Sequence, residues 1–433
     1  MSPSYLLRCT ACGAGYQDDG VRLHCDGRHA RALLRTEYAQ RTLAVDETAG
    51  GILRYEAWLP HRNEVEPSGS TAIYRSDALG DFLDLQNLWI AFNGYWPVRG
   101  ATLPSATFKD IEADAIAGRF PRDGRVLVVA SAGNTAAALA QACSRYDVPA
   151  VVVVPEQALE RLRLTAPLAP NVKIVAIGDD STYDDAIAFA ERVAQLDGFV
   201  FEGGTFNVAR RDGIGTTLLA FSEAAGELPD YYVQAIGSGA GAIAAHEAAL
   251  RLIEDGRYGA RLPRLLLVQN APSAPVYEAW RAKSESLVEE AADELTLRRR
   301  ARGLAATVLG TRVPPYGIAG GIRSILTESG GDVVVATNEQ ACDAMALFAE
   351  LEGVDIEPAA GVALAGLRNA VFAGIVPQEA VVVLHVTGGG RKIRNGAFSV
   401  TPLPALTVPL AAVREPRLAE LVAASFNSKE ATL

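Results

Sequence analysis

The sequence predicts an α/β protein with two doubly wound lobes and a functional site in the cleft between them. From about residue 105 the chain alternates short β-branched runs with alanine-rich stretches that have the spacing of amphipathic helices. Such alternation is typical of parallel sheets covered by helices on both faces. It occurs in two series, and a glycine-rich turn follows a strand in the second. A chain of 433 residues is also too long for one simple core.

The two series define the expected domains. The first has predicted strands at residues 126–130, 150–154, 172–176 and 199–201, and predicted helices at 135–146 and 182–196. The second has predicted strands at 231–236, 264–269, 332–336 and 380–385. We divide the chain into an N-terminal extension (1–70), the start of the large domain (71–104), a small α/β domain (105–205) and a large α/β domain (206–433).

The composition argues against nucleic acids and membranes as binding partners of this protein. The formal net charge of −11 argues against nucleic acid as a partner, because binding relies on clustered Lys and Arg. The one dense basic run, Arg298–Arg302, is interpreted as a solvated helix end. No stretch approaches the roughly 20 apolar residues of a membrane span. The first residues lack the apolar core of a signal peptide, so we expect a cytoplasmic protein with small-molecule substrates.

The N-terminal extension contains a possible metal site. Cys9 and Cys12 are spaced like the first ligand pair of a zinc ribbon, and Cys25 follows. The second pair is incomplete, since the next candidate ligand is His29, with His24 just before Cys25. The sequence leaves two alternatives open, a zinc site or a relic of one that folds without metal.

Lys109 is the candidate catalytic residue. It is one of five lysines among 40 basic residues, so this chain uses arginine where only a positive charge is needed. A lysine with a lowered pKa can form a Schiff base, whereas arginine cannot. Together with the turns that follow nearby strands, Lys109 suggests an enzyme that uses pyridoxal 5'-phosphate.

A small-residue turn follows the first strand of the small domain. Its amide N–H groups lie at a predicted helix N-terminus, where they can bind a substrate carboxylate. We expect Asn134 to bond a ring oxygen of the cofactor. The expected substrate-binding residues are Ser131, Ala132, Gly133 and Thr135. The alternative is that Ser131 and Asn134 only make local turn contacts.

A second turn is the candidate phosphate site. Its residues are Gly237, Ser238, Gly239, Ala240 and Gly241. Their N–H groups would converge on a phosphate. The Gly-Lys-Ser/Thr of a P-loop and the spacing of a dinucleotide fingerprint are missing. The alternative is close packing of helix on strand. The hydroxyl of Thr387, at the end of the last strand, is expected to face the pyridine nitrogen of the cofactor. The alternative for Thr387 is an ordinary turn at the end of a strand.

Taken together, the motifs resemble those of the threonine synthase family. The matching segments, in the family's order, are Thr107–Asp110, Ser131–Thr135, Gly203–Thr216, the turn at 237–241, Glu357–Ala363 and Thr387–Lys392. The cysteine-rich start is similar as well. The resemblance implies a fold-type II (tryptophan synthase β-like) pyridoxal-phosphate enzyme, with Lys109 as the lysine that holds the cofactor. Relatives of this fold usually pair, which implies a homo-oligomer, with a dimer as the first expectation.

Two segments differ from threonine synthases. The approach to Lys109 contains Tyr95-Trp96-Pro97, and Ile111 replaces an arginine of the usual motif. With Tyr55–Pro60, they resemble the branch of the family that makes L-cysteate from O-phospho-L-serine and sulfite, on the way to coenzyme M or other sulfonates.

The resemblance also implies a mechanism. Lys109, once released from the cofactor, would remove the α-proton if burial lowers its pKa. Phosphate and sulfite would need local positive charge, and the candidates are Arg99, Arg210, Arg211 and Lys392. One rival function is threonine synthase, which acts on O-phosphohomoserine. Another is a non-catalytic relative that binds a phosphorylated ligand.

Overall fold

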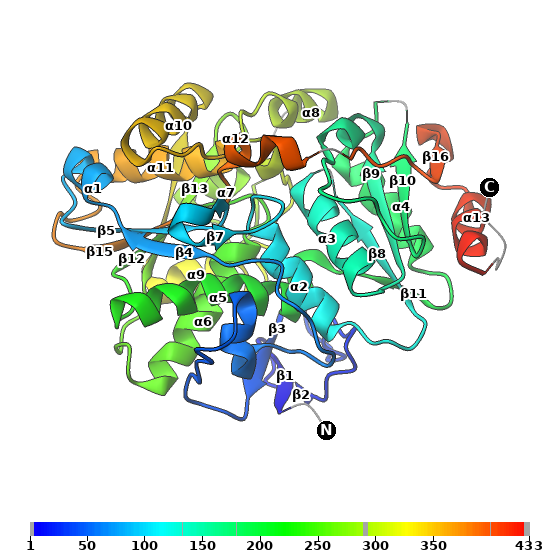
Figure 1. Cartoon of the computed structure of the whole chain (residues 1–433), viewed down its shortest axis with the longest axis horizontal. Helices are drawn as coiled ribbons and strands as arrows, with labels where there is room; N and C mark the ends of the chain where they lie inside the picture. The colour runs from blue at the N-terminus through cyan, green and yellow to red at the C-terminus, as the bar shows by residue number, and fades with distance from the viewer. Residues whose placement is uncertain (1–3, 132, 179, 289–292, 399, 428–433) are drawn as a thin grey trace.

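The computed structural model describes residues 4–131, 133–178, 180–288, 293–398 and 400–427, and its helices and strands belong to this part of the chain. Two separate sheets form two lobes, and the N-terminal extension lies against the larger one (Figure 1). The doubly wound arrangement predicted from the sequence is confirmed. Each of the eight predicted strands is present with ends that agree to within one residue.

The large lobe is built on a six-stranded sheet. In spatial order its strands are β14 (Asp332–Ala336), β13 (Arg264–Asn270), β12 (Tyr231–Ala235), β15 (Val381–Val386), β5 (Asn87–Phe92) and β4 (Ala72–Arg75). All neighbours are parallel except β4 and β5. Side chains of β12 alternate, with Val233 in the core on one face and Tyr232 in the core on the other.

Helices cover both faces of this sheet, as its apolar strands require. On one face lie α1 (Asp77–Leu83), α10 (Asn338–Glu352) and α11 (Pro358–Phe372). On the other lie α5 (Val208–Ala225), α6 (Ala240–Asp255), α7 (Pro275–Arg281) and α9 (Ile322–Ser329). The helix α8 (Glu294–Arg302) carries the basic run.

The small lobe is a five-stranded parallel sheet. Its strands, in spatial order, are β11 (Phe199–Phe201), β8 (Val126–Ala130), β9 (Ala150–Pro155), β10 (Val172–Ile177) and β16 (Leu406–Val408). One face is covered by α2 (Lys109–Arg119) and α3 (Asn134–Arg145), and the other by α4 (Tyr183–Val193) and α13 (Pro416–Asn427).

One predicted domain boundary is wrong. The sequence analysis assigned residues 206–433 to the large domain, but β16 pairs in parallel with β10 of the small sheet. α13 packs against α4 of the same lobe. The three-residue strand β16 is too short to show a pattern, and its partner is more than 200 residues away, so only the tertiary structure places it.

The N-terminal extension is a small antiparallel sheet. Its strands are β2 (Gly15–Tyr16), β1 (Tyr5–Cys9) and β3 (Leu34–Tyr38). The hydroxyls of Thr36 and Tyr38 each donate to the buried Asp212 carboxylate of α5 at 2.7 Å. The extension is therefore held on the large lobe by buried polar contacts as well as by apolar packing.

Candidate active site

Lys109 lies between the two lobes. It is the first residue of α2, which packs against α3 of the small lobe and α5 of the large lobe. This central position of α2 is visible in Figure 1. The Lys109 side chain is only 19% exposed. The structure thus puts a mostly buried amine in the region where the sequence analysis expected the site.

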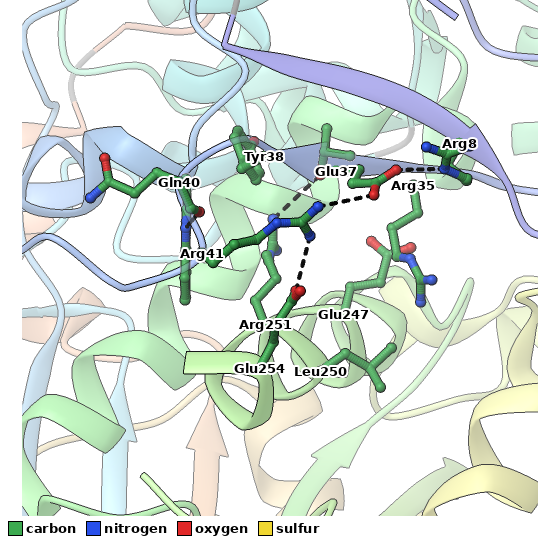
Figure 2. A pocket seen from close by; sticks show the side chains of 12 residues that line it. Arg8, Arg35, Glu37, Tyr38, Gln40, Arg41, Glu247, Leu250, Arg251 and Glu254 are labelled. Carbon is green, nitrogen blue, oxygen red and sulfur yellow. Dashed lines mark hydrogen bonds and ion pairs between the residues drawn. The ribbon is translucent and has the colours of Figure 1, made fainter. Parts of the chain in front are cut away.

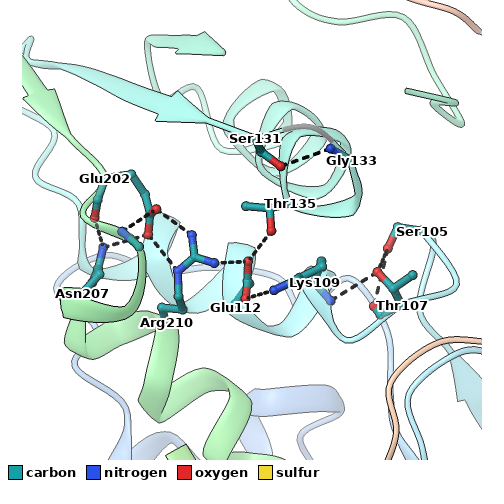
Figure 3. Close-up of polar contacts among 11 residues, drawn as sticks. Ser105, Thr107, Lys109, Glu112, Ser131, Gly133, Thr135, Glu202, Asn207 and Arg210 are labelled. Carbon is teal, nitrogen blue, oxygen red and sulfur yellow. Dashed lines mark hydrogen bonds and ion pairs between the residues drawn. The ribbon is translucent and has the colours of Figure 1, made fainter. Parts of the chain in front are cut away.

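A chain of charges surrounds the Lys109 amine (Figure 3). Lys109 Nζ donates to Glu112 Oε2 at 2.9 Å. The other oxygen of Glu112 accepts from Arg210 Nη1 at 2.6 Å and from the Thr135 hydroxyl at 3.1 Å. Arg210 also donates to Glu202 at 2.6 Å. Because Thr135 is in the small lobe and Arg210 in the large lobe, Glu112 connects both lobes to the amine.

Burial controls the charge of this amine. Desolvation lowers the pKa of Lys109 because water no longer stabilises the ammonium form, and the Arg210 guanidinium lowers it further. The Glu112 carboxylate opposes both effects without cancelling them. A lowered pKa makes the neutral, basic amine available at a lower pH than for a solvated lysine.

Two more of the expected segments meet beside Phe108, the residue before Lys109. The Phe108 amide donates to the Thr387 carbonyl at 3.0 Å, and the Gly389 amide donates to the Ala106 carbonyl at 3.0 Å. The Phe108 ring lies against the His385 ring and packs against the cluster of Ile214, Ala240 and Ala244, which includes the start of α6. The end of β15 and the start of α6 therefore both lie beside Phe108, the chain neighbour of Lys109.

The turn at 237–241 has the features of an anion-binding turn. Gly239 has a φ of +75°, a region that favours glycine. A Cβ on Gly241 would overlap the Gln234 side-chain amide, so that position has no room for a side chain. The amides of residues 237–242, before and at the start of the 16-residue helix α6, donate to no described residue. These free donors at a helix N-terminus fit the phosphate of the predicted cofactor.

The small-residue turn of the small lobe is engaged in protein contacts. The Ser131 hydroxyl accepts from the Gly133 amide at 3.3 Å, a local turn contact. The Asn134 amide group donates to Glu357 at 2.9 Å and accepts from Arg391 at 2.9 Å. Ala132, one of the expected substrate-binding residues, lies outside the described residues. The cofactor and substrate roles expected for this turn stay predictions.

The expected cations differ in position. Arg210 belongs to the network of Lys109, but two carboxylates already neutralise it. Arg99 is exposed and lies over the rings of Tyr74 and Trp96. Arg211 is buried and pairs with Glu247 at 2.9 Å.

Lys392 is exposed. Within the described chain, the structure therefore does not bring Arg99, Arg211 or Lys392 into the contacts around Lys109.

Four charged residues of the candidate site were not predicted from the sequence. Glu112 follows Lys109 at the (i, i+3) spacing that places two helical side chains together, and this signal was available. Glu357 and Arg391, which form an ion pair, both lie inside motifs that matched the family. Glu202 follows a predicted strand, but nothing in the sequence pairs it with Arg210.

A cavity of about 340 Å³ lies elsewhere, between the N-terminal extension and α6 (Figure 2). Its charged groups largely neutralise one another. Arg41 pairs with Glu37 and Glu254 at 3.1 Å each, and Glu37 also pairs with Arg8. We therefore do not assign it a ligand.

Comparison with known proteins shows the family of the chain. Residues 82–388 match the family model described as pyridoxal-phosphate dependent enzyme. The chain is 43% identical to the cysteate synthase of Methanosphaerula palustris over an alignment of 407 residues. This alignment covers 94% of this chain and 94% of that protein. It is 40% identical to the cysteate synthase of Methanosarcina barkeri, over 90% of this chain and 92% of that protein. The chain belongs to the cysteate synthase family of pyridoxal-phosphate dependent enzymes.

Solved structures confirm the predicted fold-type II architecture. Maize serine racemase superposes with a TM-score of 0.56 at 18% identity, covering 74% of this chain and 88% of that one. Threonine synthase from Escherichia coli gives a TM-score of 0.55 at 16% identity, over 79% of each chain. In the described part of the chain, no helix has the length and apolar character needed to cross a membrane.

Proposed function

We propose that this protein catalyses the β-replacement of O-phospho-L-serine by sulfite, which gives L-cysteate and phosphate. The observation that carries the proposal is a buried lysine amine near a glycine-rich turn whose amides donate to no described residue, in a chain 43% identical to a cysteate synthase over 94% of its length. In this reaction the Cβ–O bond breaks with its electrons on phosphate. A C–S bond forms from the sulfur lone pair of sulfite.

We propose that four of the described sites hold pyridoxal 5'-phosphate. We expect the Lys109 amine to hold its aldehyde carbon and the amides of 237–241 to hold its phosphate. Thr387 lies beside Lys109 through the contact of its carbonyl with Phe108, and its hydroxyl is the expected partner of the ring nitrogen. Asn134 is the expected partner of the ring oxygen. When bound, the cofactor supplies an electron sink for the bonds at the substrate α-carbon.

The Lys109 amine is the group that moves the α-proton in this proposal. Because burial lowers its pKa, the neutral amine that accepts this proton is available at a lower pH than for a solvated lysine, and it returns the proton at the end of the reaction. Glu112 holds the Nζ atom at 2.9 Å and limits its rotamers, so it is a positioning residue. Arg210 in turn fixes Glu112 from the large lobe.

Arg391 is the cation best placed to meet an incoming anion. It belongs to the group of Asn134 and Glu357, yet its side chain is 37% exposed, whereas that of Arg210 is 8% exposed. We propose that it contacts the phosphate or sulfite group. Tyr95-Trp96-Pro97, which distinguishes this branch from threonine synthases, lies near the segment that carries Arg391. The Tyr95 amide donates to the Gly389 carbonyl at 2.9 Å.

The test is to incubate the protein with O-phospho-L-serine and sulfite and, separately, with O-phosphohomoserine. Product is identified by mass spectrometry and phosphate release is measured. We expect cysteate in the first reaction only, with phosphate release dependent on Lys109. Threonine from the second reaction would make the protein a threonine synthase. No product from either, in protein that has bound cofactor, would favour a non-catalytic relative.

The Arg391 role is tested with Arg391→Gln, which should raise the KM for phosphoserine or sulfite more than it lowers kcat. Arg99→Gln, at an exposed position over two rings, is the matched control and should leave both constants unchanged.

We also propose a homodimer, to be measured by light scattering.

A further inference from the structure

Four potential metal ligands gather in the N-terminal extension, away from Lys109. The thiols of Cys9, Cys12 and Cys25 and the imidazole of His29 offer ligand atoms that all lie within 4.8 Å of one another. We propose that they bind one structural Zn²⁺, which holds the loop at 17–31 against the helix that carries Arg210. The sequence left both the metal and its fourth ligand open.

Three of the distances among the four atoms are close to those of a tetrahedral zinc site. Zn–S bonds of about 2.3 Å and Zn–N bonds of about 2.0–2.1 Å place tetrahedral ligands roughly 3.8 Å apart for S–S and roughly 3.6 Å for S–N. The sulfurs of Cys12 and Cys25 are 3.6 Å apart. His29 Nε2 lies 3.4 Å from Cys9 Sγ and 3.2 Å from Cys25 Sγ. A small expansion would accommodate the ion.

Neighbouring contacts orient the ligands as in known metal sites. His29 Nδ1 lies 2.6 Å from the Ala30 carbonyl, so Nδ1 carries the proton and Nε2 presents its lone pair to the sulfurs. Cys25 Sγ accepts from the Gly27 amide at 3.2 Å and lies 3.1 Å from the Tyr16 hydroxyl. Contacts of this kind stabilise a thiolate ligand.

The backbone permits this cluster through two glycines. Gly13 has a φ of +73°, and its amide donates to the Cys9 carbonyl at 2.9 Å, which closes the turn between the first two cysteines. A Cβ on Gly27 would lie 2.9 Å from the His29 ring. His24, the other histidine nearby, instead packs on the ring of Phe206 at 5.1 Å, so it is not a ligand.

The loop between the ligands contacts the large lobe next to the active site. Residues 17–31 contain no helix or strand, so few backbone contacts hold them. Leu23 packs closely on Gly203, since a Cβ added to Gly203 would lie 2.5 Å from the Leu23 side chain. The buried Arg119 donates to the Arg22 carbonyl at 2.9 Å and to Asn207 Oδ1 at 3.0 Å.

Asn207 caps α5 through the amide of Ala209 and donates to the Glu202 carbonyl. Arg210, which holds Glu112, is in the first turn of this helix. The metal would therefore fix the loop that packs on the start of α5. Its role is structural, because none of its ligands contacts Lys109.

The experiment is metal analysis of the full-length protein, purified under reducing conditions and without chelator. We expect about one equivalent of zinc per chain and its loss in Cys12→Ser and in Cys25→Ser. Cys342→Ser, at an exposed cysteine of α10, and His24→Ala are the matched controls and should retain it. Replacement of zinc by Co²⁺ should give the visible bands of a tetrahedral thiolate site. Those bands should change in position, without disappearing, in His29→Cys.

Zinc that is absent and not taken up on addition would overturn the proposal, as would zinc retained after loss of Cys12 or Cys25. So would iron in place of zinc, or a Cys12–Cys25 disulfide found by thiol counting.

The structural role of the metal is tested by hydrogen exchange. Metal removal should increase exchange at residues 18–31 and 203–207 and leave β12–β15 unchanged. Equal increases in all of these segments would contradict the local role.

Discussion

Gly239→Ala tests the assignment of the turn at 237–241 as the phosphate site. Gly239 has φ +75° and ψ 3°, and Gly226, the C-cap of α5, has φ +76° and ψ 6°. Alanine in this left-handed region costs roughly 1–2 kcal/mol at either position. At Gly226 an added Cβ meets nothing within 4 Å, whereas at Gly239 it lies 2.6 Å from Ile322 Cδ1. Overpacking of this kind adds roughly 1–3 kcal/mol.

We therefore expect Gly226→Ala to lower the free energy of unfolding by roughly 1–2 kcal/mol and Gly239→Ala by roughly 2–5 kcal/mol. Both values are measured by urea denaturation without cofactor. Only Gly239→Ala should weaken cofactor binding, because its backbone must move and misalign the amides. Loss of one hydrogen bond to a charged group, roughly 1.5–3 kcal/mol, corresponds to a Kd about 10- to 100-fold higher.

Fluorescence titration of the cofactor-free protein with pyridoxal phosphate gives this Kd. Unchanged cofactor affinity in Gly239→Ala, with a normal unfolding transition, would refute the assignment of the turn. Equal stability losses in the two variants would refute the packing argument.

Three further predictions follow from buried charges. Borohydride reduction of cofactor-loaded protein should tag the peptide of Lys109, and Lys109→Ala should lose both tag and activity, whereas Lys173→Ala keeps both. Burial raises the pKa of Asp110 from 3.8 to about 7, so its proton stabilises the folded state at low pH. That stability, about 4 kcal/mol at 1.36 kcal/mol per pKa unit, is lost as the pH rises from about 3.8 to about 7, with roughly 3 kcal/mol of the loss above pH 5, and Asp110→Asn should not lose it. Urea denaturation at pH 5 and pH 8 compares the two. Arg211→Met should destabilise the fold by roughly 3–5 kcal/mol, because the buried Glu247 loses its partner. Its KM for sulfite should stay unchanged, and a selective rise would return Arg211 to the substrate site.

Local patterns predicted most of the fold. The strand Val126–Ala130 was found with both ends correct, because a continuous β-branched run before a small-residue turn has few other stable conformations. Lys109 was identified by its scarcity as a residue type and by the motif around it. These features depend on neighbours in the chain, so the sequence alone carries them.

Contacts between distant segments were decided by the tertiary structure. The pairing of β16 with β10 and the ion pair of Arg210 with Glu112 join residues separated by about a hundred positions or more. The burial that lowers the pKa of Lys109 also exists only after the two lobes meet. Sequence by itself predicted the elements, the candidate catalytic lysine and the candidate zinc ligands. Folding decided which charges face that lysine. It also decided that His29 joins the cysteine cluster, because His24 packs on Phe206, which is far away in the chain.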